Sequence, residues 1–272
     1  MRYLRIGTII VFIAALVALC VTVVAVTRTD RVAPVITDEI GTLHLKAADE
    51  DTMLLQGLHA TDDRDGDISH KIVVERVSRF SEPGVCKVSY VVYDSNHNLC
   101  RYQRTVCYDD YTAPRLSLEK PLVYHAGDDI VFMDRLKLTD CLDGDLTYKL
   151  KLESSNVVYS EVGVYEIEVS AVTNYGDEVY ARLPVNIITY AAQAPVISLK
   201  QNLVYVKKGE PFDPKEYITD VKDCNGFPID VSAVFVFSQV NTAEVGAGQV
   251  RMETTDGYGR TGVTYLTVIV EE

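Results

Sequence analysis

One arrangement of residues recurs three times along this chain and constrains its fold more than any other feature. The dipeptide Ala-Pro occurs at 33–34, 113–114 and 194–195, so its prolines are 80 and 81 residues apart. A Thr-Asp pair, a glycine and a turn rich in Gly, Asn and Asp follow each Ala-Pro in the same order. Because the landmarks keep their order and spacing, we predict three tandem repeats of about 80 residues. The predicted segments are residues 1–31, 32–112 (first repeat), 113–192 (second repeat) and 193–272 (third repeat).

Within each repeat the apolar residues alternate with polar ones, which is typical of half-buried β-strands. After Gly163 the inward set comprises Tyr165, Ile167, Val169 and Ala171. The matching sets are Cys86, Val88, Tyr90 and Val92 in the first repeat, and Val250, Met252 and Thr254 in the third. A turn and a second β-rich run follow each strand, which predicts a hairpin. We therefore predict an all-β fold of three tandem immunoglobulin-like antiparallel β-sandwiches, without the core Trp of antibody domains because the chain has no Trp.

The N-terminal segment carries a long uncharged run, residues 6–26, of 21 residues. A helix of this length crosses a hydrocarbon core of about 30 Å. We predict a transmembrane signal-anchor with a cytoplasmic tip, which would make the protein a single-pass plasma-membrane protein with its body outside the cytoplasm. A cleavable signal peptide is the alternative, since Val23 and Ala25 suit the −3 and −1 positions of a cleavage site.

The charge of the chain excludes one class of partner. The sequence has 26 Lys and Arg against 39 Asp and Glu, a net charge of −13. Residues 1–31 hold four Arg and one Asp, a balance of +3, which leaves −16 on residues 32–272. A body this acidic disfavours nucleic acid and anionic lipid surfaces, because both depend on positive charge in the protein.

The landmark residues resemble a known group of domains. Ala-Pro-x-Ile is followed by Thr-Asp-x-x-Asp-Gly-Asp, then by Pro-Gly or Val-Gly before a Tyr/Val strand, and then by Asp-Ser-x-x-Asn. This order resembles the bacterial surface Ig-like domains found in tandem in Gram-positive envelope proteins and in some pesticidal crystal toxins, and is similar to the hyalin-repeat Ig-like domains. The third repeat departs from it, with Asp223-Cys224-Asn225-Gly226 in place of Asp-Gly-Asp. The resemblance implies an extracytoplasmic stalk or adhesion module and does not imply an enzyme.

Clusters of aspartates are the candidate ligands for a metal ion. Each cluster can form an ordinary turn, in which Asp accepts backbone N–H bonds while Gly66 and Gly144 take a positive φ. The alternative is a weak calcium site, because converging carboxylates repel one another unless a cation neutralises them. The candidates are Asp109, Asp110, Asp140, Asp143 and Asp145 at the joint between the first two repeats, and Asp62, Asp65 and Asp67, together with Asp94, Asn96 and Asn98, within the first repeat.

No motif of a known enzyme class is present in the sequence. The five His lie on scattered segments without a metal-ligand spacing, and neither a nucleophile elbow nor a P-loop nor a dinucleotide fingerprint occurs. We therefore expect a non-catalytic protein, with Ca²⁺ as the one cofactor under consideration.

Five cysteines lie beyond the apolar run, at positions 86, 100, 107, 141 and 224. An odd number leaves at least one unpaired within the chain. A bridge between Cys86 and Cys107 would need a bulge, because alternation places Cys86 inside and Cys107 outside. The disulfide state therefore stays open at this point.

Three functions fit these features. The first is a membrane-anchored cell-surface stalk or adhesion protein that binds an unknown envelope partner. The second is a carbohydrate- or peptidoglycan-binding protein, for which seven tyrosines could supply the aromatic surface: Tyr93, Tyr102, Tyr108, Tyr111, Tyr159, Tyr180 and Tyr190. The third is a regulatory ectodomain of an envelope complex.

Overall fold

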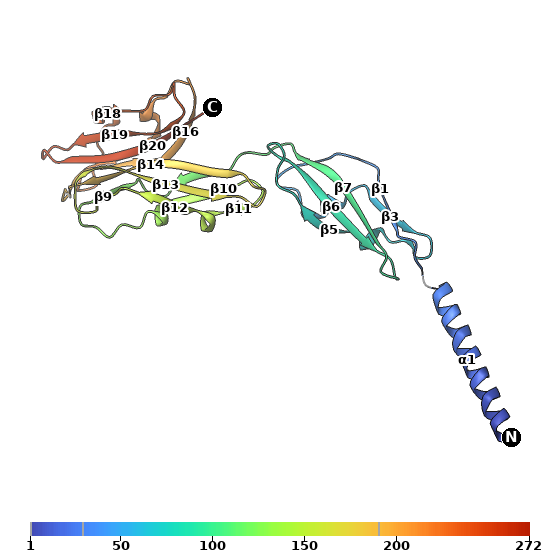
Figure 1. Cartoon of the computed structure of the whole chain (residues 1–272). Helices are drawn as coiled ribbons and strands as arrows, with labels where there is room; N and C mark the ends of the chain where they lie inside the picture. Colours follow the sequence, from blue (N-terminus) through green and yellow to red (C-terminus); the bar gives the residue numbers. More distant parts are fainter. Residues whose placement is uncertain (1, 29, 190) are drawn as a thin grey trace. The chain divides into compact units, whose positions relative to one another are not determined.

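The computed structural model describes residues 2–28, 30–189 and 191–272. The chain divides into two compact units, Met1–Asp110 and Tyr111–Glu272. The first compact unit contains helix α1 (Arg2–Arg28) and the first repeat, and the second contains the second and third repeats. Beyond α1 the regular structure is almost wholly β (Figure 1).

The predicted membrane span is not supported. In the described part of the chain, no helix is both long enough and apolar enough to cross a membrane.

Each repeat forms two sheets. The first repeat comprises β1 (Val35–Asp38), β2 (Leu43–Leu45), β3 (Leu58–Asp62), β4 (Gly66–Asp67), β5 (Val73–Val77), β6 (Val85–Tyr93) and β7 (Leu99–Tyr108), with 3-10 helices η1 (Asp51–Leu55) and η2 (Ser69–Lys71). The sheets have the strand orders β1-β3-β4 and β2-β7-β6-β5.

The second repeat follows the same plan. It comprises β8 (Arg115–Leu118), β9 (Val123–His125), β10 (Leu136–Asp140), β11 (Gly144–Asp145), β12 (Lys151–Ser155), β13 (Gly163–Val172) and β14 (Glu178–Ile188), with η3 (Met133–Arg135) and η4 (Thr147–Lys149). The sheets have the orders β11-β10-β8 and β12-β13-β14-β9.

The third repeat has one strand fewer. It comprises β15 (Val196–Leu199), β16 (Leu203–Lys207), β17 (Ile218–Lys222), β18 (Phe235–Ser238), β19 (Gly246–Thr255) and β20 (Thr261–Glu271), with η5 (Pro214–Tyr217) and η6 (Val231–Ala233). The sheets have the orders β15-β17 and β16-β20-β19-β18.

The strand pairing corrects the expectation of a purely antiparallel fold. In each repeat the second strand pairs in parallel with the last strand: β2 with β7, β9 with β14 and β16 with β20. The first strand belongs to one sheet, and the chain then crosses to the edge of the other sheet, where it runs in the same direction as the last strand. The sequence pattern shows which residues are inward but does not show this crossing.

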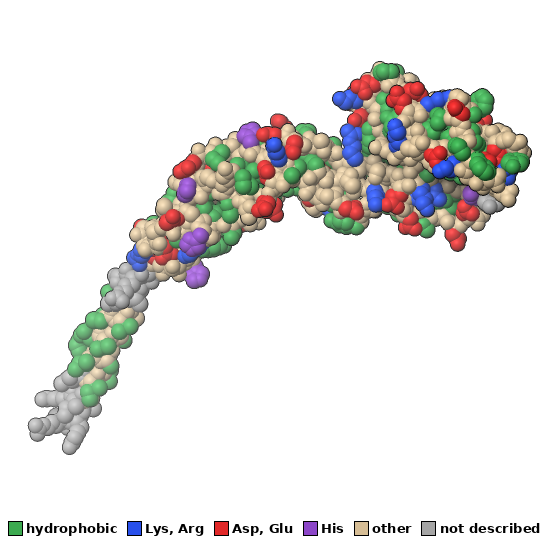
Figure 2. Space-filling view, turned by 180° about the vertical axis from the view of Figure 1, so that it is seen from behind, with side chains coloured by type: hydrophobic (Ala, Val, Ile, Leu, Met, Phe, Trp, Pro, Cys, Tyr) green, Lys and Arg blue, Asp and Glu red, His purple; other side chains and the backbone are tan. Residues whose placement is uncertain are grey.

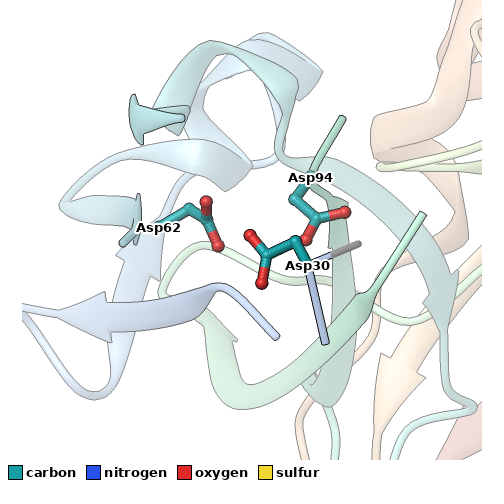
Figure 3. A group of neighbouring side chains, drawn as sticks. All are labelled: Asp30, Asp62 and Asp94. Carbon is teal, nitrogen blue, oxygen red and sulfur yellow. The ribbon is translucent and has the colours of Figure 1, made fainter. Parts of the chain in front are cut away.

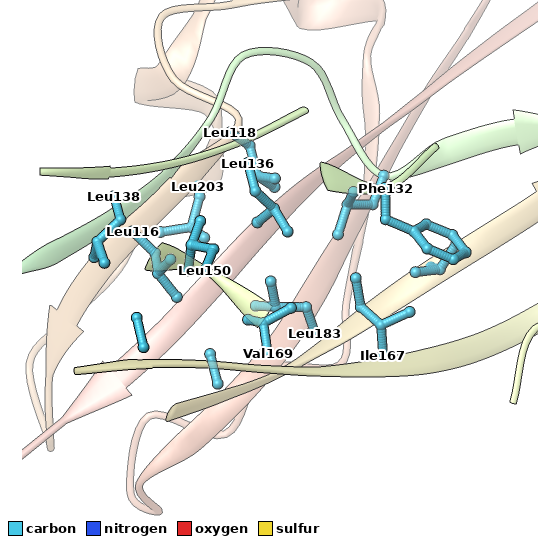
Figure 4. Packing of buried hydrophobic residues seen from close by; sticks show 14 of the residues in the cluster. Leu116, Leu118, Phe132, Leu136, Leu138, Leu150, Ile167, Val169, Leu183 and Leu203 are labelled. Atoms are coloured by element: carbon cyan, nitrogen blue, oxygen red, sulfur yellow. The ribbon is translucent and has the colours of Figure 1, made fainter. Parts of the chain in front are cut away.

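The predicted inward residues form the cores. Cys86, Val88, Tyr90 and Val92 on β6 are fully buried, as are Val250, Met252 and Thr254 on β19. In the second repeat, Ile167 and Val169 on β13 pack against Leu116 and Leu138 of the facing sheet (Figure 4). Burial of these apolar side chains, at about 25 cal/mol per Å² of apolar area, is the main favourable term in the stability of each repeat.

A buried ion pair crosses the core of the first repeat, and the sequence pattern did not reveal it. Arg104 on β7 is an inward residue whose guanidinium lies 3.4 Å from a carboxylate oxygen of Asp38 on β1. The same guanidinium donates to the hydroxyl of Tyr90 and to the backbone carbonyls of Leu54 and Gln56. These partners satisfy a charge that would otherwise be costly to bury.

The second and third repeats pack against each other within the second compact unit. Leu203 on β16 belongs to the buried cluster of the second repeat. The backbone N–H of Leu116 donates to the Tyr205 hydroxyl at 2.8 Å, and the Arg115 guanidinium lies 4.2 Å from the centre of the Tyr205 ring. The side chain of Asn186, itself buried, donates to Gln249. This seam therefore combines apolar burial with satisfied polar groups.

All six cysteines are free thiols. The register pairs Cys86 with Val106 and Cys107 with Val85, so the two cysteines occupy neighbouring rather than opposed positions. Burial and the nearby Cys107 raise the pKa of Cys86 to about 11. Cys86 is therefore an inert core residue.

Candidate functional site

The first aspartate of each cluster closes a turn. One oxygen of Asp62, at the end of β3, accepts the backbone N–H groups of Arg64 and Asp65 at 3.0 and 2.9 Å. Asp140 accepts the corresponding pair after β10, at 2.8 Å each. Gly66 and Gly144 follow with φ of 72° and 70°, as predicted from the turn chemistry.

The second aspartate connects this turn to the hairpin turn beside it. Asp65 accepts the backbone N–H and the hydroxyl of Ser95 at 2.7 and 2.6 Å. These hydrogen bonds, with a smaller contribution from Lys71, hold the pKa of Asp65 below its usual value. Asp143 has the same role in the second repeat, where it accepts from the backbone N–H and side-chain amide of Asn174.

The third aspartate accepts hydrogen bonds from the first residue of a short 3-10 helix. Asp67 accepts the hydroxyl and backbone N–H of Ser69, and Asp145 accepts the backbone N–H of Thr147. These bonds lower the pKa of both carboxyls. Asp65 and Asp67 of the first repeat therefore accept hydrogen bonds within turns. Asp143 and Asp145 do the same in the second repeat.

The two aspartates before the second repeat have partners in the first compact unit. A carboxylate oxygen of Asp109 lies 2.8 Å from Nδ1 of His44, and Asp110 accepts the backbone N–H of Ala47 at 2.7 Å. The predicted joint site combines these residues with Asp140, Asp143 and Asp145 of the other compact unit, and it stays a prediction.

Three other carboxylates converge in the first repeat. Oxygens of Asp30, Asp62 and Asp94 all lie within 4.8 Å of one another (Figure 3). The three residues are 3%, 9% and 6% exposed. Sequence reasoning had placed Asp62 and Asp94 in one cluster, but it missed Asp30, which lies outside the repeat pattern, and it included Asp65 and Asp67. Carboxylates of this type and spacing could hold a hard cation.

Not all of these oxygens have partners. Oδ2 of Asp30 and Oδ2 of Asp62 are buried and accept no hydrogen bond. The Arg64 guanidinium, which is partly exposed, lies 3.5 Å from Oδ2 of Asp30. Asp94 differs, since it accepts from the backbone of Asn96 and from the backbone and side chain of Asn98. Burial acts to raise the pKa of Asp94, but these bonds outweigh burial and the pKa lies below its usual value.

The corresponding position of the second repeat holds hydroxyl groups. Thr173 occupies the place of Asp94, and Asp177, four residues later, occupies the place of Asn98. The Thr173 hydroxyl donates to Asp177 at 3.2 Å. Burial, and then a hydrogen bond with Asp177, raise the pKa of Tyr111, which lies two residues before Ala113. Hydroxyl donors therefore satisfy the carboxylate of Asp177.

The third repeat fills the position with a guanidinium. Asp256 takes the place of Asp94, and Arg260 takes the place of Asn98. The Arg260 side chain donates to Asp256 at 2.9 Å through Nε, and a terminal nitrogen lies 2.7 Å from the same oxygen. The guanidinium also donates to the side chains of Gln193 and Cys224. A protein cation thus neutralises the buried carboxylate here.

A second feature is an aromatic face on the third repeat. The strand register places Phe237 of β18 beside Arg251 of β19, and Arg251 beside Tyr265 of β20. Phe235 and Phe237 are 64% and 50% exposed, and the Arg251 guanidinium lies 5.6 Å from the centre of the Phe237 ring. We call Phe235, Phe237, Arg251 and Tyr265 the aromatic face.

Two hollows flank the aromatic face within the second compact unit. One, of about 420 Å³, is lined by the amide side chains of Asn186, Gln239 and Gln249. The other, of about 560 Å³, is lined in part by His125, Thr189 and Thr261. Arg251 and Tyr265 line both hollows, so the row from Phe237 to Tyr265 lies between them.

The tyrosines expected to form a binding surface do not supply this face. Tyr102 donates to Asp38, Tyr108 packs edge-on against Phe80, and Tyr111 bonds Asp177. Tyr93, Tyr159 and Tyr180 are exposed but lie on separate segments, and Tyr190 is outside the described residues. The alternation Phe235-Val236-Phe237 was the available sequence signal, since it places two large apolar rings on one side of a strand.

Acidic and basic side chains are mixed on one face of the molecule. On the face seen in Figure 2, acidic and basic side chains are interspersed over the two compact units.

Comparison with known proteins gives one related sequence. No family model matches the chain. The pesticidal crystal protein Cry22Aa of Bacillus thuringiensis is 27% identical over 227 residues, which cover 78% of this chain and 29% of that protein. The match agrees with the resemblance to surface-type Ig-like β-domains, without identifying a particular repeat family. The chain spans less than a third of the length of this relative.

Solved structures give only distant matches. The M60 catalytic domain with the CBM51-1 and CBM51-2 domains of Clostridium perfringens ZmpB is 16% identical, with 89% of this chain and 31% of that chain covered and a TM-score of 0.25. The protocadherin GammaB4 extracellular domain is 11% identical, with 87% and 49% covered and a TM-score of 0.21. Scores this low carry no argument about function.

Proposed function

We propose that this chain is a non-catalytic binding module of three tandem immunoglobulin-like β-sandwiches, and that its third sandwich binds an uncharged carbohydrate. The aromatic face is the observation that supports the ligand. Exposed rings can stack on the C–H faces of a sugar, while the exposed amide of Gln239 beside them can bond its hydroxyl groups. The net charge of −16 on residues 32–272 disfavours an acidic glycan.

The role of Arg251 fits an uncharged ligand. Its guanidinium lies 2.5 Å from a carboxylate oxygen of Glu253, so its charge is balanced within the face. The guanidinium keeps several N–H donors in one plane, which suits neighbouring sugar hydroxyls as well as the Phe237 ring.

A glycan array with the full-length chain tests this function. We expect saturable binding to neutral oligosaccharides, with peptidoglycan fragments as a separate arm. Phe237→Ala should weaken binding about tenfold or more, because truncating a central aromatic contact typically costs that much. Phe227→Ala is the matched control, since Phe227 is also exposed in the third repeat but lies off the aromatic face. Equal binding by Phe237→Ala and the wild type would show that the aromatic face does not bind the carbohydrate.

The location of the protein outside the cytoplasm is a proposal that rests on the sequence alone. Protease added to intact cells should digest residues 32–272 while a cytoplasmic marker survives. Full protection of these residues in intact cells, with digestion after lysis, would contradict this location. A stable partner captured by crosslinking in the same cells would instead favour the regulatory ectodomain.

A further inference from the structure

We propose that the first repeat contains a calcium site formed by Asp30, Asp62 and Asp94, in addition to the proposed carbohydrate-binding function. The three carboxylates come from distant parts of the chain: the segment before β1, the end of β3 and the turn after β6. They converge on one space, as Figure 3 shows.

Burial makes a cation necessary. Three carboxylates that are more than nine-tenths buried repel one another strongly, because the protein interior screens charge far less than water. An oxygen of Asp30 and one of Asp62 accept no hydrogen bond, although buried carboxylate oxygens are normally satisfied. The Arg64 side chain is half exposed and its Nε is 3.5 Å away from Asp30, too far for a hydrogen bond.

The identity of the ion follows from the ligand atoms. The cluster offers carboxylate oxygens, which are the ligands of hard cations rather than of zinc or copper. Ca²⁺ binds oxygens at about 2.3–2.6 Å, so oxygens on opposite sides of it stand about 5 Å apart. The three oxygens lie within 4.8 Å of one another, so one ion can contact all of them. Mg²⁺ loses its water reluctantly and demands a near-ideal octahedron, so three carboxylates from separate segments favour Ca²⁺.

The three repeats provide an internal comparison. At the same place, the second repeat satisfies its carboxylate with hydroxyls of Thr173 and Tyr111, and the third with the guanidinium of Arg260. The first repeat has Asn98 there, which carries no charge. A bound metal ion would therefore neutralise the buried carboxylates of the first repeat, as Arg260 neutralises Asp256 in the third.

Binding would also secure the start of the first repeat. Asp30 lies two residues beyond the end of α1 and is followed by Arg31, which is exposed. Asp30 belongs to neither a helix nor a strand, and its carbonyl accepts a hydrogen bond from the Asn98 side chain. Calcium should therefore protect the bond after Arg31 from trypsin.

Calorimetry of the full-length, chelator-treated chain with CaCl₂ tests the site. We expect one ion per chain with a Kd below about 1 mM, a melting temperature higher by about 5 °C or more at 10 mM Ca²⁺, and cleavage after Arg31 slowed about tenfold. Asp62→Asn should weaken binding about tenfold or more.

Asn98→Arg is the decisive variant, because it places a guanidinium where the third repeat has one. It should lose the calcium response while melting, without calcium, at or above the wild-type temperature. Asp143→Asn is the matched control: it removes a turn carboxylate of the second repeat and should bind as the wild type does.

Three results would overturn the proposal: no heat or melting shift at 10 mM Ca²⁺, unchanged affinity in Asn98→Arg, or loss of binding in the Asp143→Asn control. Unchanged affinity in Asn98→Arg would place any bound ion elsewhere. This conclusion holds even if Asp62→Asn fails to fold. Equal affinity for Mg²⁺ would overturn the preference for calcium. None of these results bears on the aromatic face, so the carbohydrate proposal can fail independently.

Discussion

Val169→Asp is expected to unfold the second repeat at ambient temperature. Val169 is fully buried on β13 and packs in the cluster with Leu116 and Leu183. The substitution places a carboxylate among apolar side chains with no donor, which should cost about 4 kcal/mol or more of unfolding free energy. Urea denaturation followed by circular dichroism measures this loss.

Val164→Asp is the matched control for this prediction. Val164 is on the same strand but is 72% exposed, so the charge stays in water and the cost should be within about 0.5 kcal/mol. Because Leu203 of the third repeat packs in the same cluster, the loss in Val169→Asp should reach the third repeat as well. Wild-type stability of Val169→Asp would mean that the inward face of β13 is wrongly assigned.

Arg104→Met is expected to destabilise the first repeat by about 3–5 kcal/mol. The substitution leaves the carboxylate of Asp38, whose side chain is almost fully buried, without its ion-pair partner. It also removes the donor to the carbonyls of Leu54 and Gln56. Arg101→Met, on the same strand, breaks the exposed pair with Glu75 and should cost no more than about 1 kcal/mol.

The pH dependence of stability provides a second readout of this ion pair. Burial acts to raise the pKa of Asp38, but hydrogen bonds from Ile40, Gly41 and Tyr102, with the charge of Arg104, lower it overall. A lowered pKa means that the stabilisation is complete above the unfolded-state value of about 3.9 and is lost as the pH falls through the folded-state value. Arg104→Met should lose part of this dependence below about pH 4, and an unchanged profile would contradict the assignment.

The sequence allowed much of the fold to be predicted because alternation and turn chemistry are local. The inward residues of β6, β13 and β19 and the positive φ of Gly66 and Gly144 follow from neighbours within about ten residues. The parallel pairing of β2, β9 and β16 depends instead on where the chain crosses between sheets, and that crossing has no local signature.

The candidate sites were predicted only in part, for the same reason. Asp62 and Asp94 belong to recurring motifs and were grouped correctly, whereas Asp30 precedes the repeat and joins them only through the folded structure. Asp65 and Asp67 resemble metal ligands in sequence. In the structure they accept hydrogen bonds from the hydroxyls of Ser95 and Ser69 within turns. The aromatic face combines residues of three strands, and the register in which these strands pair could not be deduced from composition.

Anomalous diffraction from crystals of the full-length chain grown with calcium tests the central claim most directly. We predict one anomalous peak among Asp30, Asp62 and Asp94, at about 2.3–2.6 Å from at least one oxygen of each. No peak should occur beside Asp256, where Arg260 already neutralises the carboxylate. An empty position between the three aspartates at 10 mM Ca²⁺, with their oxygens bonded to protein groups instead, would contradict the account.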